Sequence, residues 1–483
     1  MTGARREALA IAALALAAVL VWALVPTYPN YDAYYHLVWG RELLHGHKPT
    51  FQAYQAPTEH PLYVALSTLL AAVFGGAADR ALVLVAALSL AALVWAVWRL
   101  GRAVFGTWPG VLAALLTGSS FALLLYTARA YVDVPFLAVV LWAGALEAER
   151  PRRGTLVMAL LAVAGLLRPE AWILAGAYWL WMVVPVDRSG PPTGKRDLHL
   201  GLLALAAVGP ACWALTDLWV TGDPFYSLHA TSGLADELHR ERGVRHVPGS
   251  FVSFLADALR PPVFLAARAG FALAAWRRAA HAIHVPLALL GGGTLAFVLS
   301  GAAGLSILPR YLTVPAIALT LYAGYAIAGW AALPASDSLR RPWAIGVAVL
   351  ALLGAGFVVA RISVVGRFTA ELRFIRGTHD DLVAILADPA VVRARACGPV
   401  TLPNYRLVPD TRWELDASQR EVGARSARRR PYGVALFFTD AKMLRRFGFA
   451  QGASTLTNVP DPGFVLAVHN GSYAAYVRCP PAR

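Results

Sequence analysis

Charged residues are scarce in this chain. They make up 15% of its 483 residues, whereas hydrophobic residues make up 58%, and the mean hydropathy is +0.55. This composition argues against a soluble globular protein. Apolar runs of roughly 18 to 25 residues recur, which is the length that a helix needs to cross a bilayer. We therefore expect a polytopic α-helical membrane protein, because a helix satisfies its backbone hydrogen bonds within its own segment.

Cysteine is scarce as well, with three residues in the whole chain. Cys212 lies in an apolar run, where it reads as a small core residue. Cys397 and Cys479 fall in the more polar C-terminal part. They form a disulfide if that part faces an oxidising compartment and stay thiols if it does not.

The sequence also lacks a recognisable nucleotide-binding motif, a repeat of solenoid period and a low-complexity tract. The net charge of +15 raises the question of a nucleic-acid partner. Many of the arginines, however, form short clusters between apolar runs, which is the positive-inside signal of membrane topology. We therefore expect no nucleic-acid partner, and we expect membrane lipids around the chain.

The apolar runs predict about eleven transmembrane helices, with the N-terminus in the cytoplasm and the C-terminus outside. The first run follows Arg6 and has no cleavage pattern after it, so we expect it to be retained. Residues 62–75 are short for a span, and we expect a helix in the outer interface. The remaining predicted spans are 81–98, 109–126, 134–147, 155–167, 171–185, 199–219, 256–276, 285–305, 312–332 and 343–361.

The composition changes near Phe368, where Arg, Asp, Pro and Asn become more frequent. Short β-type runs at 434–438, 464–468 and 473–477 predict a small α+β domain with its own core. We therefore expect a transmembrane catalytic domain over residues 1–365 and an extracytoplasmic C-terminal domain over residues 366–483.

The most informative stretch runs from Pro29 to Pro61, between two apolar segments. Helical spacing predicts a helix over residues 33–45, with Gly46 as its stop. Asp32 stands just before this helix among several tyrosines, Tyr35 among them. A carboxylate so close to a membrane span indicates either a helix N-cap or a catalytic group.

The other unusual polar residues also fall at the predicted outer ends of spans. Asp32 and Asp133 suit a general base or a metal site, and arginines suit a phosphate, whose oxygens match the guanidinium fork. The candidate residues for phosphate or substrate binding are Arg129, Arg168, Glu170, Arg310, Tyr311, His60 and Tyr35.

Each of these residues also has a structural interpretation. Asp133 and Arg129 stand four residues apart and could simply pair. Arg168 and Glu170 could form an ion pair within a turn, and Arg310 could extend its charge to the interface. His60 precedes Pro61 and suits a turn. Three further histidines, His36, His45 and His47, show no metal-ligand spacing, so no metal site is assigned, and the sequence does not require a divalent metal.

Three motifs in the Pro29–Pro61 stretch carry a family resemblance: N-Y-D-A-Y-Y-H, then G-R-E-L-L-H-G-H-K-P, then E-H-P-L-Y. They resemble the first external loop of the GT-C superfamily of membrane glycosyltransferases. This superfamily includes protein mannosyltransferases, aminoarabinose transferases and actinobacterial mannosyl- and arabinosyltransferases. Asp32 matches the catalytic acidic position of that loop. Gly46 and Pro49 match its turn, and His60 to Leu62 match its last element.

Later segments resemble further motifs of the family, so that the resemblance covers about 330 residues. R-A-Y-V-D at 129–133 is similar to its second acidic motif, and L-L-R-P-E at 166–170 and P-R-Y-L at 309–312 are similar to its arginine motifs. Many members have two adjacent acids in the first loop, whereas Asp32 is followed by Ala33. This departure does not favour a metal-dependent mechanism.

The resemblance implies an inverting glycosyltransferase in the cytoplasmic membrane, with its active site on the outer face. It implies a polyprenyl-phosphate sugar as donor and a glycan, lipid or protein of the cell envelope as acceptor. Two alternatives remain. One is a transporter or flippase of lipid-linked sugar, which predicts broken helices and polar residues at mid-membrane depth, and the sequence shows little of either. The other is a cell-wall glycan ligase or polymerase.

Overall fold

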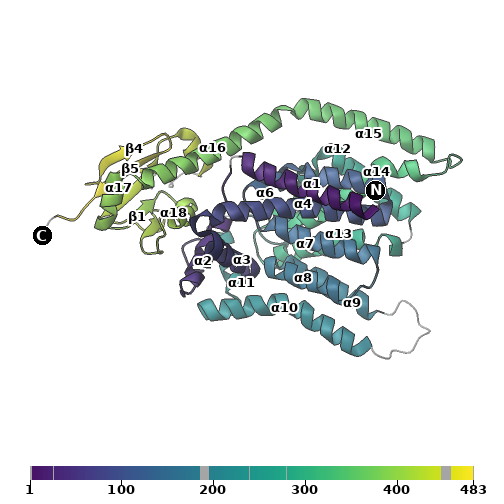
Figure 1. The fold of residues 1–483 in the computed structure, drawn as a ribbon, viewed down its shortest axis with the longest axis horizontal. Helices are drawn as coiled ribbons and strands as arrows, with labels where there is room; N and C mark the ends of the chain where they lie inside the picture. Colours follow the sequence, from purple (N-terminus) through teal and green to yellow (C-terminus); the bar gives the residue numbers. More distant parts are fainter. Residues whose placement is uncertain are drawn as a thin grey trace. The chain divides into compact units, whose positions relative to one another are not determined.

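A computed structural model describes residues 3–25, 27–184, 195–238, 240–278, 280–447 and 458–481, and they are mostly helical (Figure 1). The chain divides into two compact units. The first, here called the helical unit, comprises residues 1–24, 60–63 and 83–364. The second, here called the loop–sheet unit, comprises residues 25–59, 64–82 and 365–483.

The helical unit is built from long apolar helices joined by short turns. In the described part of the chain, seven helical stretches are long and apolar enough to cross a membrane, or eight if a bent pair counts as one span. The predicted number of eleven is not confirmed, because the helices at three of the predicted spans, α7, α8 and α9, have only 17, 13 and 14 residues. The helices are α1 (Gly3–Leu24), α4 (Ala78–Phe105), α5 (Thr107–Gly118), α6 (Phe121–Ala128), α7 (Asp133–Glu149), α8 (Thr155–Leu167), α9 (Glu170–Val183), α10 (Lys195–Thr221), α11 (Tyr226–Glu237), α12 (Val247–Arg277), α13 (His284–Ala302), α14 (Thr313–Ala328) and α15 (Arg340–Arg361).

Helix α14 is the centre of the helical unit, since nearly all of its residues are buried. It packs against α5, α12 and α13. Small residues allow this close approach: a Cβ atom added to Gly270 of α12 would lie 1.8 Å from the carbonyl oxygen of Tyr322. Helices in lipid associate through such contacts because lipid tails are as apolar as their side chains.

Two helices near α14 are interrupted. α5 and α6 meet at a bend of 54°. Helix α12 is kinked at Arg260, whose φ of 63° and ψ of 151° are not helical, and Pro261 and Pro262 follow it. Each proline lacks a backbone donor and clashes with the preceding turn, which explains the kink.

The loop–sheet unit combines the stretch after the first span with the C-terminal part of the chain. Its five-stranded sheet has the order β2-β1-β3-β5-β4, in which β1 is parallel to β2 and β3, and β5 is antiparallel to β3 and β4. Side chains of α16 and α17 pack with those of the strands in one apolar core. The elements are α2 (Tyr31–Leu44), α3 (Pro61–Phe74, of which residues 64–74 belong here), α16 (Ser363–Leu386), α17 (Pro389–Ala394), β1 (Val400–Leu402), α18 (Val408–Glu414), β2 (Val422–Ala424), β3 (Gly433–Phe438), α19 (Ala441–Arg446), β4 (Val465–His469) and β5 (Tyr473–Arg478).

Several sequence predictions agree with these elements. The helix predicted at 33–45 is α2, and Gly46 follows it with a φ of 75°. The three predicted strands are β3, β4 and β5, whereas β1 and β2 were missed because each has only three residues. A disulfide joins Cys397 and Cys479, with a Cα–Cα distance of 4.9 Å. The predicted domain assignment, with its boundary at residue 365, stays a prediction.

Candidate active site

Asp32 lies in the first turn of α2 but does not cap this helix. The cap is Asn30, whose side-chain oxygen accepts a hydrogen bond from the backbone N–H of Ala33 at 3.1 Å. Asn is a favoured N-cap, because its short side chain reaches the unpaired amides of the first turn. The alternative interpretation of Asp32 as the cap is therefore wrong, and its side chain is half-buried.

Aromatic side chains surround Asp32 along α2. Tyr35 is 1% exposed, and its ring centroid lies 5.1 Å from that of Tyr31 and 5.2 Å from that of Trp39. Burial raises the pKa of Tyr35 to about 12. Burial lowers the pKa of His36 to about 4, and its Nδ1 donates to the carbonyl oxygen of Asp32 at 2.6 Å. His36 is therefore neutral at pH 7.

Arg41 and Glu42, from the G-R-E-L-L motif, attach α2 to α18. The Arg41 guanidinium donates to the carbonyl oxygens of Arg412 and Trp413 at 2.7 and 2.9 Å. Glu42 accepts a hydrogen bond from Arg412 at 2.6 Å. Arg41 thus adds a charged donor to two carbonyls in the last turn of α18, which also accept hydrogen bonds from the backbone N–H groups of Ala417 and Asp416. The first loop and the C-terminal part therefore form one unit.

In the helical unit, Arg168 joins two of the predicted carboxylates. It stands where α8 ends, and its guanidinium forms ion pairs with Asp133, at the start of α7, and Glu170, at the start of α9. Arg168 is 3% exposed and Asp133 is fully buried. The predicted pair of Arg168 and Glu170 is present, whereas the alternative in which Asp133 pairs only with Arg129 is wrong.

Tyr311 connects this ion-pair cluster to Arg310. The Cζ atom of Arg168 lies 5.4 Å from the centre of the Tyr311 ring, and that of Arg310 lies 5.8 Å from it. Both distances allow a cation–π interaction. Arg168 is compensated by two carboxylates, Asp133 and Glu170.

The R-A-Y-V-D segment has a constrained backbone. Ala130 has a φ of 50°, which is unfavourable for a residue with a Cβ atom, and its carbonyl oxygen accepts a hydrogen bond from the Tyr63 hydroxyl at 2.8 Å. Strain of this kind persists where the surrounding structure requires it. His60 is buried and contacts the Trp213 ring edge-on, at a centroid distance of 5.6 Å.

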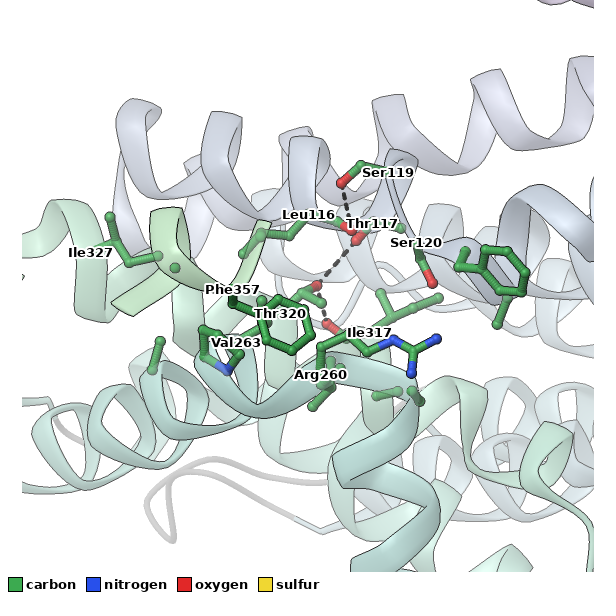
Figure 2. Close-up of a pocket in the computed structure, with 18 of the residues that line it drawn as sticks. Leu116, Thr117, Ser119, Ser120, Arg260, Val263, Ile317, Thr320, Ile327 and Phe357 are labelled. Carbon is green, nitrogen blue, oxygen red and sulfur yellow. Dashed lines mark hydrogen bonds between the residues drawn. The ribbon is translucent and has the colours of Figure 1, made fainter. Parts of the chain in front are cut away.

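A largely apolar groove of about 530 Å³ runs between α5, α6, α12, α14 and α15 (Figure 2). Arg260 and Ser120 lie at one end of it and Ile327 at the other (Figure 2). Along α14, the distance from Thr313 to Ile327 is roughly 20 Å at 1.5 Å per residue. The hydroxyl of Thr313 also donates to the carbonyl oxygen of Arg310 at 2.8 Å, so that the groove begins beside the segment that carries Arg310 and Tyr311.

The structure thus groups most of the predicted site residues by unit. Asp133, Arg168, Glu170, Arg310 and Tyr311 lie at one end of the helical unit, whereas Asp32 and Tyr35 belong to the loop–sheet unit. That Asp32 faces the arginines of the other group stays a prediction. Among the described residues, no three His, Cys, Asp or Glu side chains are grouped to hold a metal ion.

Sequence reasoning missed three arginines that border cavities, Arg260, Arg412 and Arg420. Arg260 was overlooked because it lies inside an apolar run, although the two prolines after it were a signal of a kink. Arg412 is 1% exposed, and its partner Glu42 is 370 residues away in the chain. No local sequence pattern predicts a contact between two residues that are so far apart in the chain.

Comparisons with known proteins agree with this architecture. A family model described as dolichyl-phosphate-mannose-protein mannosyltransferase matches residues 56–213. The crystal structure of ArnT from Cupriavidus metallidurans bound to undecaprenyl phosphate is similar over 98% of both chains, with 14% sequence identity and a TM-score of 0.55. The same protein in the apo state gives 14% identity and a TM-score of 0.53, again over 98% of both chains.

A third similar structure is an oligosaccharyltransferase from Archaeoglobus fulgidus tethered to an acceptor peptide. It has 12% identity and a TM-score of 0.48 over 86% of this chain and 63% of its own, which is too low to support an argument. No curated protein sequence matches the chain.

The chain therefore has the fold of ArnT, a polytopic helical membrane protein with a small sheet domain. The family model covers about a third of the chain, and its match agrees with the resemblance to membrane glycosyltransferases that the sequence motifs carry.

Proposed function

We propose that this protein is a glycosyltransferase of the GT-C type, which transfers a sugar, with inversion, from a polyprenyl-phosphate donor to an acceptor of the cell envelope on the outer face of the membrane. The GT-C fold and the family match support sugar transfer. The ArnT structure with the same fold was determined with undecaprenyl phosphate bound, which supports a lipid-linked donor. The observation that carries the proposal is that Asn30 caps α2 in place of Asp32.

In this mechanism Asp32 accepts the proton of the acceptor hydroxyl. The hydroxyl oxygen forms a bond to the anomeric carbon, and the bond between that carbon and the phosphate oxygen breaks on the opposite side of the ring. The polyprenyl phosphate leaves with the electron pair. Arg310 and Arg129 offset the charge that develops on this leaving phosphate, which is the larger electrostatic task.

Arg168 acts as a positioning residue in this proposal. Its ion pairs with Asp133 and Glu170 hold together the ends of three helices, α7, α8 and α9. Its guanidinium also lies against the ring of Tyr311, next to Arg310. The cluster thus positions Arg310, whereas the charge of Arg168 is compensated by the two carboxylates and does not act on the substrate.

The apolar groove is suited to the prenyl chain of the donor. It combines a long apolar wall with a cation, Arg260, and hydroxyls at one end, which matches a lipid with an anionic head. Its end at Thr313 adjoins Arg310 through a hydrogen bond. A chain in this groove would bring its phosphate to the segment that carries the arginines.

The disulfide supports the proposed orientation. Disulfides persist in oxidising compartments and are rare in the cytosol. The bond between Cys397 and Cys479 therefore favours a loop–sheet unit outside the cytoplasmic membrane. The predicted inner loops are basic, which agrees with the same orientation.

The test is a transfer assay with purified protein, radiolabelled polyprenyl-phosphate sugars and a membrane extract as acceptor. Asp32→Asn is expected to lower kcat by about 100-fold or more, since a general base contributes roughly 10² to 10⁴. Asn30→Ala is the matched control, because it removes the cap of the same helix and keeps Asp32. If Asp32→Asn transfers sugar as fast as the wild type does, Asp32 is not the base and the mechanism is wrong.

The flippase alternative has one observation in its favour. It predicted broken helices, and the structure contains two breaks that the sequence analysis did not find, the bend between α5 and α6 and the kink at Arg260. Both border the groove. A flippase moves intact lipid-linked sugar between the leaflets of a vesicle, so this activity without release of polyprenyl phosphate would favour it over transfer.

A further inference from the structure

A second cavity, here called the basic pocket, lies within the loop–sheet unit. It has a volume of about 140 Å³ and lies between the first loop, strands β1 and β2 and the segments on both sides of β2. Among the described residues it is lined by four arginines and no carboxylate. The lining residues used below are Tyr35, Tyr54, Arg412, Arg420, Arg428 and Arg430.

Three of the four arginines have no ion-pair partner in the described part of the chain. No carboxylate lies within salt-bridge distance of Arg420, Arg428 or Arg430, although other arginines of this unit form such pairs. Nearby acids are engaged elsewhere. Asp461 pairs with two other arginines. Glu421 accepts hydrogen bonds from Ser418, which hold its pKa below the usual value.

Arg412 forms the rigid floor of the pocket. It is 1% exposed, and it donates to the carbonyl oxygen of Ala417 at 3.3 Å, to the hydroxyl of Thr50 at 3.1 Å and to Glu42 at 2.6 Å. These three contacts hold the guanidinium in place before any ligand arrives. Because Glu42 compensates the charge of Arg412, the net positive charge of the pocket comes from Arg420, Arg428 and Arg430.

Aromatic rings complete the lining. Tyr54 is 40% exposed, and its ring meets that of Tyr405 edge-on at a centroid distance of 6.4 Å. Tyr35 is buried beside Arg412 at the base of the pocket. A partly exposed ring next to cationic groups offers an apolar face to a sugar and charge to its substituent. Among the described lining residues, no long apolar wall accompanies these groups, so an acyl chain would find no place here.

We propose that the basic pocket binds the phosphate or carboxylate substituent of an acidic saccharide. Guanidinium groups pair with either oxyanion in a two-pronged geometry, and the small volume suits one such group and not a whole glycan. That this saccharide is the acceptor rests on the proposed function, whereas the binding of an acidic saccharide to the basic pocket does not. The acceptor of the transferase is then an acidic cell-envelope glycan.

The test is calorimetric titration of the full chain in nanodiscs of zwitterionic lipid, without donor. The probes are glucose 6-phosphate, glucuronate and glucose. The two acids are expected to bind and glucose is not. Arg428→Gln/Arg430→Gln is expected to raise the Kd for the acids at least 10-fold, and Arg420→Gln alone to raise it several-fold.

The control is Arg367→Gln/Arg393→Gln, which removes the same charge from two exposed positions of the same unit outside the pocket. Its Kd is expected to stay within twofold of the wild type. The proposal is overturned if glucose binds as tightly as the acids, or if the control weakens binding as much as the pocket variant does. It is also overturned if the protein binds vesicles that contain phosphatidylglycerol but binds neither acid. Asp32→Asn should bind the acids normally, so a failure of the transfer mechanism is distinguished from a failure of this site.

Discussion

At the scale of single residues, position in the sequence indicated where polar groups gather but not how they pair. Asp133 stands four residues from Arg129, which suggested a local pair. It pairs with Arg168, 35 residues further along the chain. The i,i+4 geometry holds only within a continuous helix, whereas α6 ends at Ala128 and α7 begins at Asp133.

Asp410 provides a prediction at this scale. It is 4% exposed, and burial raises its pKa to about 7, although the nearby His379 opposes the shift. In the unfolded chain an aspartate titrates near pH 3.9. Between about pH 4 and pH 7 the folded protein therefore keeps a proton that the unfolded chain has lost, and stability falls as the pH rises.

Asp410→Asn removes this titration and keeps a neutral side chain of the same shape. We expect the free energy of unfolding of Asp410→Asn to fall less between pH 5 and pH 8 than that of the wild type. At pH 8 the variant should be more stable by up to about 4 kcal/mol, which corresponds to a shift of about three pKa units. Thermal unfolding at several pH values measures it. Asp380→Asn, at an exposed position, is the control. An unchanged pH dependence in Asp410→Asn would contradict the prediction.

At the scale of secondary-structure elements, the sequence predicted those with a long periodic pattern. α2 and the three longer strands belong to this group, and long apolar runs predicted helices such as α13, α14 and α15. Periodicity did not predict the break between α5 and α6 or the kink of α12, because an interrupted helix keeps its apolar composition. The prolines after Arg260 are a local signal, but their effect depends on the neighbouring helices.

Helix α18 is expected to depend on Arg41. This side chain donates two hydrogen bonds to carbonyls of its last turn and pairs with Asp416. Arg41→Gln is expected to lower the free energy of unfolding of the loop–sheet unit by about 2 kcal/mol, since hydrogen bonds to charged groups contribute roughly 1.5 to 3 kcal/mol. It should also speed hydrogen exchange of the α18 amides. Arg393→Gln, on the surface of α17, should change neither measurement.

At the scale of the whole molecule, the chain joins its beginning and its end in one unit. Residues 25–59 and the C-terminal part share the contacts of Arg41, Glu42 and Arg412, more than 360 residues apart. This arrangement attaches the helix of Asp32 to a folded sheet.

The disulfide should stabilise this unit. It connects residues 82 positions apart, and a bond that closes so long a loop restricts the unfolded chain. Cys397→Ser/Cys479→Ser is expected to lower the free energy of unfolding by about 3 kcal/mol, measured by denaturant titration. Reduction of a Cys212→Ala variant should reproduce the loss, since this variant keeps only the disulfide cysteines. No change on reduction would refute the prediction.

The sequence by itself determined the membrane class, the α+β character of the C-terminal part and the motifs of a GT-C glycosyltransferase. These properties reside in composition, periodicity and short motifs, all of which are local. Only the tertiary structure decided that Asn30 caps α2, that Arg168 unites Asp133 and Glu170, and that Arg412 underlies a basic pocket beside the first loop. Each of these features depends on contacts between side chains that are distant in the sequence or on different elements. Tertiary packing, and not the local sequence pattern, determines those contacts.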